Sequence, residues 1–206
     1  MSELTFDFSV MGLFRVTMLG ASFYPPSKKL IKPLALYDTL ESEEISFALM
    51  VPSAIDMLSP YADEMELPYL KISQFCGEAL KIQQIRIWKE VCDSTQIDNV
   101  YGPTEATIYC TRYTIPPNIE DCKHHNGIVC IGEPMTHVRL GLGNDKELYL
   151  GGKQTTMGYV KANPTQKEAF FEQDEVWFYK SGDIGLSDEQ EYYCLGRIDE
   201  QVKIQG

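Results

Sequence analysis

Between residues 45 and 100 short apolar runs alternate with helical patterns, and this alternation most restricts the fold. The run 45–51 is stopped by Pro52 and precedes a helical segment at 54–58. A second run at 69–76 precedes an amphipathic helix at 80–92. Buried strands that alternate with helices are typical of α/β proteins with a parallel sheet. We therefore predict an α/β unit in this half of the chain.

A third strand, expected at 97–100, leads into the turn Tyr101-Gly102-Pro103-Thr104-Glu105. Glycine and proline bend the chain sharply, so Thr104 and Glu105 project from one turn. A threonine hydroxyl can donate to a phosphoryl oxygen, a carboxylate can hold Mg²⁺, and a tyrosine ring offers its face to a purine. Ligands of open α/β sheets bind at this carboxyl edge. A rigid turn with an exposed ring is an equal interpretation of these residues alone.

The second half consists of short β-rich runs separated by glycine, proline and asparagine. The runs lie at 128–131, 138–142, 147–150, 176–179 and 192–195. This pattern predicts a small β-barrel. One helix is expected to start at Asn163-Pro164, with Ala169, Phe170 and Phe171 supplying its apolar contacts. The expected organisation is a partial α/β subdomain at 1–112, a barrel-like subdomain at 113–198 and a hinge at 199–206.

The net charge of −12 and the isoelectric point near 4.7 argue against a nucleic-acid or anionic-membrane partner, because both require a basic surface. The apolar runs are too short to span a bilayer, and the first residues do not resemble a signal peptide. We therefore expect a cytoplasmic protein.

The six cysteines are spread without CxxC pairs, which favours free buried thiols. Cys122, His124, His125 and Cys130 lie close in sequence, so a metal site there is an alternative. A second ligand pair at metal spacing is missing, and a polar loop is the favoured interpretation.

Asp7 is the one carboxylate in the apolar segment 4–14. Burying a charge is costly unless a partner compensates it. Asp7 could instead cap a helix at 8–14, a common role for aspartate. Taken alone, this segment favours helix capping.

Two more polar groups stand near the end of the chain. Asp183 follows a Ser-Gly turn, and such a carboxylate can accept both hydroxyl protons of a ribose. Arg197 and Lys203 bracket acidic residues in the last segment. For each group alone, turn chemistry and a solvated charged face are the favoured interpretation.

Six blocks together resemble the adenylate-forming ligases, specifically the adenylation domains of nonribosomal peptide synthetases and the D-alanine–carrier protein ligases. The blocks appear in family order along nearly the whole chain. They are Phe6-Asp7-Phe8-Ser9, Phe75-Cys76-Gly77-Glu78, Tyr101-Gly102-Pro103-Thr104-Glu105, 147–152 with Gly158-Tyr159, Tyr179-Lys180-Ser181-Gly182-Asp183, and 196–203. The resemblance implies a partial acyl-adenylate-forming core, a mixed α/β subdomain followed by a small β-barrel subdomain.

The resemblance assigns a role to each nucleotide-binding position. Tyr101, next to Gly102, would stack on adenine. Thr104 would contact the α-phosphate, and Glu105 would help hold Mg²⁺. Thr104 and Glu105 are therefore the catalytic candidates. Asp183 would bind the ribose hydroxyls, with Arg197 adding a hydrogen bond from the ribose side. Asp199 matches the hinge before the family's C-terminal domain.

The resemblance also implies an amino-acid pocket. Asp7 would pair with the α-ammonium group of the substrate, which we favour over helix capping because it explains a buried carboxylate. The remaining pocket positions are Phe8, Met11, Leu49, Gln74, Cys76, Gly77, Val100, Ile108 and Tyr109. Such a wall is mostly apolar. Met11 and the Phe-Cys-Gly-Glu block resemble the D-alanine ligases and hint at a small amino acid.

The implied reaction joins an amino acid to ATP, giving an aminoacyl-adenylate and pyrophosphate, and then passes the acyl group to the phosphopantetheine of a carrier protein. ATP, Mg²⁺ and phosphopantetheine are the implied cofactors. The family's phosphate loop and C-terminal domain are not in this sequence, so we expect a fragment that needs these parts of the enzyme and is inactive alone. Two alternatives remain: a non-catalytic nucleotide- or carrier-binding module, and an acyl- or aryl-CoA ligase, which Asp7 disfavours.

Overall fold

The first half of the chain forms a mixed sheet with the order β1-β2-β3-β4-β7. The computed structural model describes residues 7–25, 32–188 and 191–199. The strands of this sheet are β1 (Phe47–Met50), β2 (Ile72–Phe75), β3 (Gln96–Tyr101), β4 (Thr111–Thr114) and β7 (Glu133–Pro134). β1, β2 and β3 are parallel, whereas β4 and β7 are antiparallel to their neighbours. The predicted α/β unit is confirmed, and its sheet reaches beyond residue 112.

One face of this sheet packs on α3 (Ser53–Leu58) and α4 (Ile82–Val91), with the 3-10 helix η1 (Ser59–Glu64) following α3. Trp88 of α4 donates from its indole nitrogen to Ser73 Oγ at 2.9 Å and meets the ring of Phe75 edge-on. Since side chains alternate along a strand, Gln74 and Cys76 point to the opposite face. Large apolar side chains fill the α4 side and form the main core.

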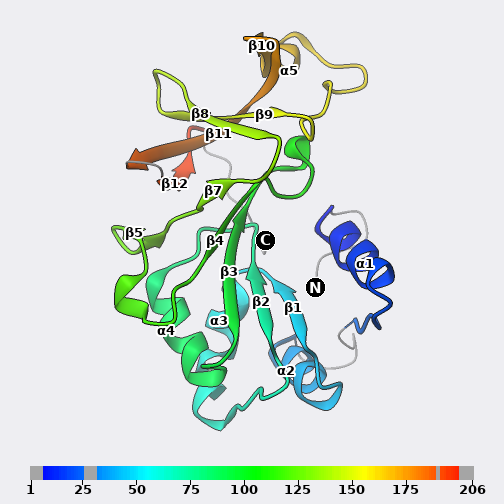
Figure 1. Cartoon of the computed structure of the whole chain (residues 1–206), viewed down its shortest axis with the longest axis vertical. Coiled ribbons are helices and arrows are strands. Elements are labelled where there is room, and N and C mark those ends of the chain that lie inside the picture. The colour runs from blue at the N-terminus through cyan, green and yellow to red at the C-terminus, as the bar shows by residue number, and fades with distance from the viewer. Residues whose placement is uncertain (1–6, 26–31, 189–190, 200–206) are drawn as a thin grey trace.

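The opposite face is approached by α1 (Phe8–Met18), which lies beside β1 in Figure 1, apart from α3 and α4. Phe8 of α1 is buried with Cys76 and Val100, from β2 and β3 or their ends. The helix expected at 8–14 is therefore present and continues to Met18. α2 (Lys32–Ser42) is a further helix that the sequence pattern did not predict.

The second half forms an open sheet with the order β10-β11-β9-β8, and β12 pairs with β11. Its strands are β8 (Val138–Leu142), β9 (Glu147–Gly152), β10 (Phe170–Gln173), β11 (Val176–Asp188) and β12 (Glu191–Arg197). Figure 1 shows this sheet at the far end of the molecule from α2. The predicted barrel is not confirmed, because the strands of the described residues do not close into a ring.

The helix expected after Asn163 is α5 (Pro164–Glu168), and the Asn163 side chain accepts a hydrogen bond from the Gln166 N–H at 2.9 Å. The expected helical contacts of Phe170 and Phe171 are wrong. Both residues lie in β10, where Phe171 pairs with Phe178 of β11 and their rings stack. The partner strand, rather than the local pattern, decides the conformation there.

The remaining elements are short. They are the 3-10 helices η2 (Thr104–Ala106) and η3 (Ile119–Asp121) and the hairpin of β5 (His124–His125) and β6 (Ile128–Val129). None of the helices in the described ranges is long and apolar enough to cross a membrane.

Candidate functional site

The turn after β3 folds back tightly on the segment that leads to β4. A Cβ atom at Gly102 would lie 2.5 Å from Tyr109 Cα and 2.9 Å from the Cys110 nitrogen, so a side chain does not fit. The Tyr101 carbonyl accepts a hydrogen bond from the Cys110 N–H at 2.8 Å. Glycine is therefore needed here for a close backbone approach. η2 starts immediately afterwards and presents Thr104 and Glu105.

Tyr101 and Asp183 join the two sheets. The Tyr101 hydroxyl donates to Asp183 Oδ2 at 2.6 Å, although the residues are 82 positions apart in sequence. Burial, together with the Asp183 carboxylate, raises the pKa of Tyr101 well above its usual value, so the hydroxyl stays protonated and remains a donor. The ring is half-buried beside Ala106 and Cys110. The predicted adenine and ribose residues are thus adjacent.

Arg197 lies on the other side of Asp183. Its Nη1 donates to the Ser181 carbonyl at 2.7 Å and to Asp183 Oδ1 at 3.2 Å. Nε and Nη2 donate to the two oxygens of Asp199, each at 2.9 Å. These hydrogen bonds to Asp199, followed by the charge of Asp183, raise the pKa of Arg197. Arg197 therefore links the predicted ribose residue to the predicted hinge residue; residues 200–206 of that hinge lie outside the described residues.

Glu105 contacts the segment between β9 and α5 through Tyr159, whose hydroxyl donates to Glu105 Oε1. The Tyr159 hydroxyl also lies 3.5 Å from the Tyr179 hydroxyl. Burial and the hydrogen bond to Glu105 raise the pKa of Tyr159. Thr104, at the start of η2, is exposed. Tyr159 belongs to one of the six family blocks, but the resemblance gave it no role.

Gln154 supports the same turn, a role that the sequence pattern did not predict. Its Nε2 donates to the carbonyls of Ala106 at 2.7 Å and Tyr109 at 2.9 Å. In return, the Thr107 hydroxyl donates to the Gln154 carbonyl at 2.6 Å. A lone glutamine between glycines carries no local signal for such a contact, since its partners lie more than forty residues away.

Most of the predicted amino-acid pocket comes together between α1 and the sheet. Phe8, Cys76 and Val100 form a buried cluster, and Leu49, Ile108 and Tyr109 pack against it. Met11 is half-buried on α1, one turn after Phe8. Gly77 follows Cys76 with φ +93°, a conformation that favours glycine. Gln74 belongs to the same face and makes polar contacts instead of lining an apolar wall.

Asp7 precedes α1 and does not cap it. Its side chain makes no capping hydrogen bond to the helix. Its Oδ2 atom is buried and lacks a hydrogen-bond partner in the described structure. An unpartnered buried carboxylate oxygen is costly, and it is the arrangement that a bound cation would satisfy.

The last residue of the Phe-Cys-Gly-Glu block has a structural role. Glu78 accepts from the Ser53 N–H at 2.8 Å and from the Ser53 hydroxyl at 3.0 Å. These bonds satisfy the first turn of α3. Glu78 thereby fixes the loops that follow β1 and β2.

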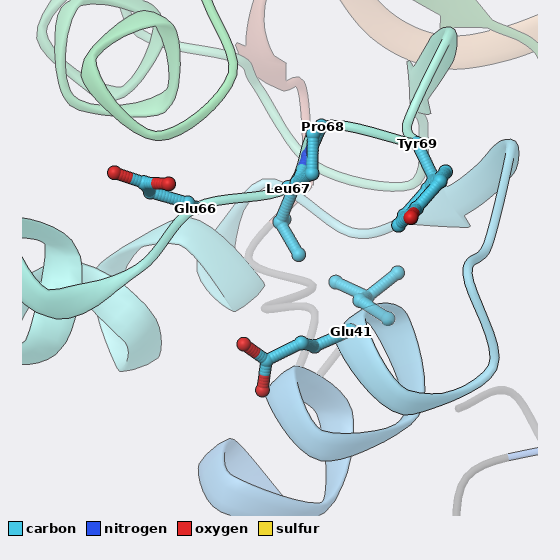
Figure 2. Close-up of a pocket in the computed structure, with 6 residues that line it drawn as sticks. Glu41, Glu66, Leu67, Pro68 and Tyr69 are labelled. Carbon is cyan, nitrogen blue, oxygen red and sulfur yellow. The ribbon is translucent and has the colours of Figure 1, made fainter.

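A surface hollow of about 200 Å³ lies away from these residues. Figure 2 shows Glu41, Glu66, Leu67, Pro68 and Tyr69 around it, and Leu40 completes its lining. These residues come from the end of α2 and the segment before β2, at the amino ends of the strands. Ligands of open α/β sheets bind at the carboxyl ends, so the hollow is separate from the predicted site.

The cysteine and histidine cluster shows no metal geometry. Groups of three or more metal-ligating side chains that could hold an ion were not found among residues 7–25, 32–188 and 191–199. The Cys130 thiol donates to Glu191 Oε2 at 2.9 Å, and Cys122 is buried in the main core.

Comparison with known proteins identifies the family of the chain. The family model described as "AMP-binding enzyme" matches residues 1–160. The chain belongs to the AMP-binding enzyme family. The D-alanine–D-alanyl carrier protein ligase of Bacillus velezensis is 29% identical over 216 residues, covering 100% of this chain and 43% of the relative. The Staphylococcus aureus ligase of the same name is 30% identical, covering 100% and 42%.

The fold of this member of the AMP-binding enzyme family is also found among solved structures. The Vibrio cholerae adenylation domain AlmE, in complex with glycyl-adenosine-5'-phosphate, matches with a TM-score of 0.84 and 28% identity over 98% of this chain and 40% of that one. The chain thus spans less than half the length of the relatives it matches.

Proposed function

We propose that the chain forms the adenosine and amino-acid walls of an adenylation domain, which joins an amino acid to AMP and passes it to a carrier protein. The buried, unpartnered Oδ2 of Asp7 carries this proposal. Asp7 directly precedes Phe8, which is buried in a cluster with Cys76 and Val100, and an α-ammonium group bound there would give Oδ2 a charge-assisted partner.

The nucleotide side of the proposal rests on Tyr101 and Asp183. Each oxygen of Asp183 accepts one hydrogen bond from the protein, and a carboxylate oxygen can accept a second, so ribose hydroxyls can add to the existing contacts. The half-buried ring of Tyr101 offers one face to adenine. Arg197 holds Asp183 from the side away from Tyr101 and fixes its orientation.

Glu105 fits a Mg²⁺ ion that arrives with ATP. Mg²⁺ is usually held by one or two carboxylates together with phosphate oxygens and water, so a single protein carboxylate is enough. The ion would neutralise charge on the phosphates. Tyr159 orients the carboxylate of Glu105 by donating to one oxygen, and Thr104 lies within the same turn to donate to the α-phosphate.

The substrate and partners follow from the relatives. The ligases of Bacillus velezensis and Staphylococcus aureus are named for D-alanine and its carrier protein. The bulky side chains that meet between α1 and the sheet support a small amino acid here as well. Transfer to phosphopantetheine, a cytoplasmic location and a hinge at Asp199 belong to the same proposal.

Amino-acid-dependent ATP–pyrophosphate exchange tests the function. It should be measured for this chain and for a chimera in which the segments of the Bacillus velezensis ligase outside the match flank it. We expect exchange with alanine or glycine in the chimera and little in the chain alone. A folded chimera that exchanges with no amino acid contradicts the function, whereas carrier-protein binding without nucleotide binding would favour a non-catalytic module.

A further inference from the structure

Gln74 lies at the inner end of the predicted amino-acid pocket. In the sheet it pairs in register with Leu49 of β1 and Asp98 of β3. Cys76, which belongs to the apolar cluster, follows two residues later on the same face. Two residues span about 7 Å along a strand, so Gln74 lies one step behind Cys76, toward the amino ends of the strands.

Both ends of the Gln74 amide are hydrogen-bonded. Nε2 donates to Asp98 Oδ2 at 3.0 Å, and Oε1 accepts from Arg15 Nη1 at 3.0 Å. Because a carboxylate only accepts and a guanidinium only donates, the two partners fix which way the amide points. Gln74 is 2% exposed, so moving its amide would leave buried polar groups unpaired.

The two partners are themselves held in place. Asp98 also accepts from the Thr114 hydroxyl at 2.8 Å and from Gln96 Nε2 at 3.0 Å. The guanidinium carbon of Arg15 lies 4.2 Å from the centre of the Phe47 ring, a cation–π contact. The amide of Gln74 is therefore clamped between a buried carboxylate and a stacked guanidinium.

Arg15 is connected to the substrate side through α1. Met11 and Arg15 follow Asp7 by four and eight positions, and such residues share one face of a helix. The same face thus carries the predicted ammonium-binding residue at one end and the residue that holds Gln74 at the other. A substrate whose ammonium group meets Asp7 would direct its side chain into the apolar cluster, with Gln74 behind it.

We propose that Arg15 is a specificity-determining residue that acts through Gln74. By holding the amide in place, Arg15 gives the pocket a rigid polar floor that admits hydrogen or a methyl group and excludes longer apolar side chains. The exclusion has two causes: the amide cannot move aside without losing its partners, and an apolar side chain cannot replace those hydrogen bonds. This inference rests on the proposed function.

Calorimetry with the 206-residue chain tests the role of Arg15 with three ligands: AMP and stable alanyl- and leucyl-adenylate mimics. We expect the wild-type chain to favour the alanyl over the leucyl mimic. Arg15→Met should reduce this preference by about tenfold or more. A change of this size is typical of the discrimination that a pocket achieves between substrates whose side chains differ by small apolar groups. The reduction should come from tighter leucyl binding, with AMP affinity unchanged. Arg15→Lys, which can still donate to Gln74, should restore much of the preference.

Arg139→Met is the matched control, because Arg139 is an exposed residue on β8. This variant should prefer the alanyl over the leucyl mimic to the same extent as the wild type. If the wild-type chain binds no AMP, the proposed function fails. If AMP and the alanyl mimic bind but folded Arg15→Met keeps the wild-type preference, this inference fails alone. If Arg15→Met does not fold, Gln74→Ala decides: increased leucyl binding supports the rigid floor, and an unchanged preference overturns it.

Discussion

Tyr101 and Asp183 are joined by a hydrogen bond of 2.6 Å between the phenol and the carboxylate, across 82 positions of sequence. Tyr101 ends β3 of the first sheet, and Asp183 lies in the middle of β11 of the second. The bond therefore connects the two sheets at the place where adenosine is proposed to bind. It also places an aromatic face next to a carboxylate, the two groups that a purine and its ribose require.

Tyr101→Phe removes this bond and keeps the ring. The Asp183 side chain is 8% exposed, and loss of one donor should lower the free energy of unfolding by about 1–2 kcal/mol. Urea denaturation measures the change. AMP affinity should stay within about threefold of the wild type, because the stacking face remains. Tyr24→Phe, at an exposed position, is the control; equal stability of both variants would show that the bond contributes nothing.

Gly102→Ala tests the tight turn after β3. The added methyl would lie 2.5 Å from a backbone atom of Tyr109, and the required shift should cost about 1–3 kcal/mol. Gly141→Ala is the matched control, since its Cβ would meet no atom within 4 Å. The two variants are compared by urea denaturation. If Gly102→Ala is no less stable than Gly141→Ala, the close approach is not required for folding.

Asp7→Ala separates binding from stability. Because Oδ2 is buried without a partner, its removal should leave the free energy of unfolding unchanged or raise it by up to about 1 kcal/mol. The same variant should lose affinity for an alanyl-adenylate mimic by about tenfold or more, while AMP affinity is retained. Asp63→Ala, at an exposed position, serves as the control. A large loss of stability in Asp7→Ala would show that the carboxylate serves the fold.

Glu191 should make stability depend on pH. Its burial alone would raise the pKa of the carboxyl, but hydrogen bonds from the Cys130 thiol and the Lys123 ammonium outweigh burial, and the net pKa is lowered from 4.5. A lowered carboxyl pKa contributes stability that is present above the unfolded pKa and is lost as pH falls through the folded pKa.

Glu191→Gln should therefore be less stable than the wild type near neutral pH, and the difference should shrink as pH falls from about 6 to about 3. Thermal unfolding across this range measures it. Glu172→Gln, at an exposed position on β10, should show no such trend. A difference between Glu191→Gln and the wild type that is independent of pH would contradict the assignment.

Local patterns predicted the elements that depend on local chemistry. The bounds of β8 are those expected, and α5 begins where Asn163 caps it. β10 was predicted as part of a helix because its pairing with β11 is a tertiary contact. The open second sheet was interpreted as a barrel for a similar reason, since closure depends on which strands meet.

The candidate site also contains residues that the sequence indicated and contacts that it did not indicate. The family resemblance assigned Cys76 to the amino-acid pocket and Tyr101 and Asp183 to adenosine; the structure brings these residues into a cluster and a hydrogen bond, and their roles stay predictions. The contact of Arg15 with Gln74 spans 59 positions, and its charged and amide groups carry no spacing signal. A polar contact of this kind cannot be predicted from local sequence, because it depends on how α1 and the strands of the sheet are placed in the folded protein.

The central claim is that separate turns of this chain build one aminoacyl-adenosine site, and calorimetric titration with a stable alanyl-adenylate mimic tests it most directly. We expect the folded wild-type chain to bind the mimic, and Asp183→Asn to weaken binding by about tenfold or more, the effect of a lost hydrogen bond to a charged group. A folded wild-type chain that does not bind the mimic, or an Asp183→Asn variant that binds it equally well, would contradict the claim.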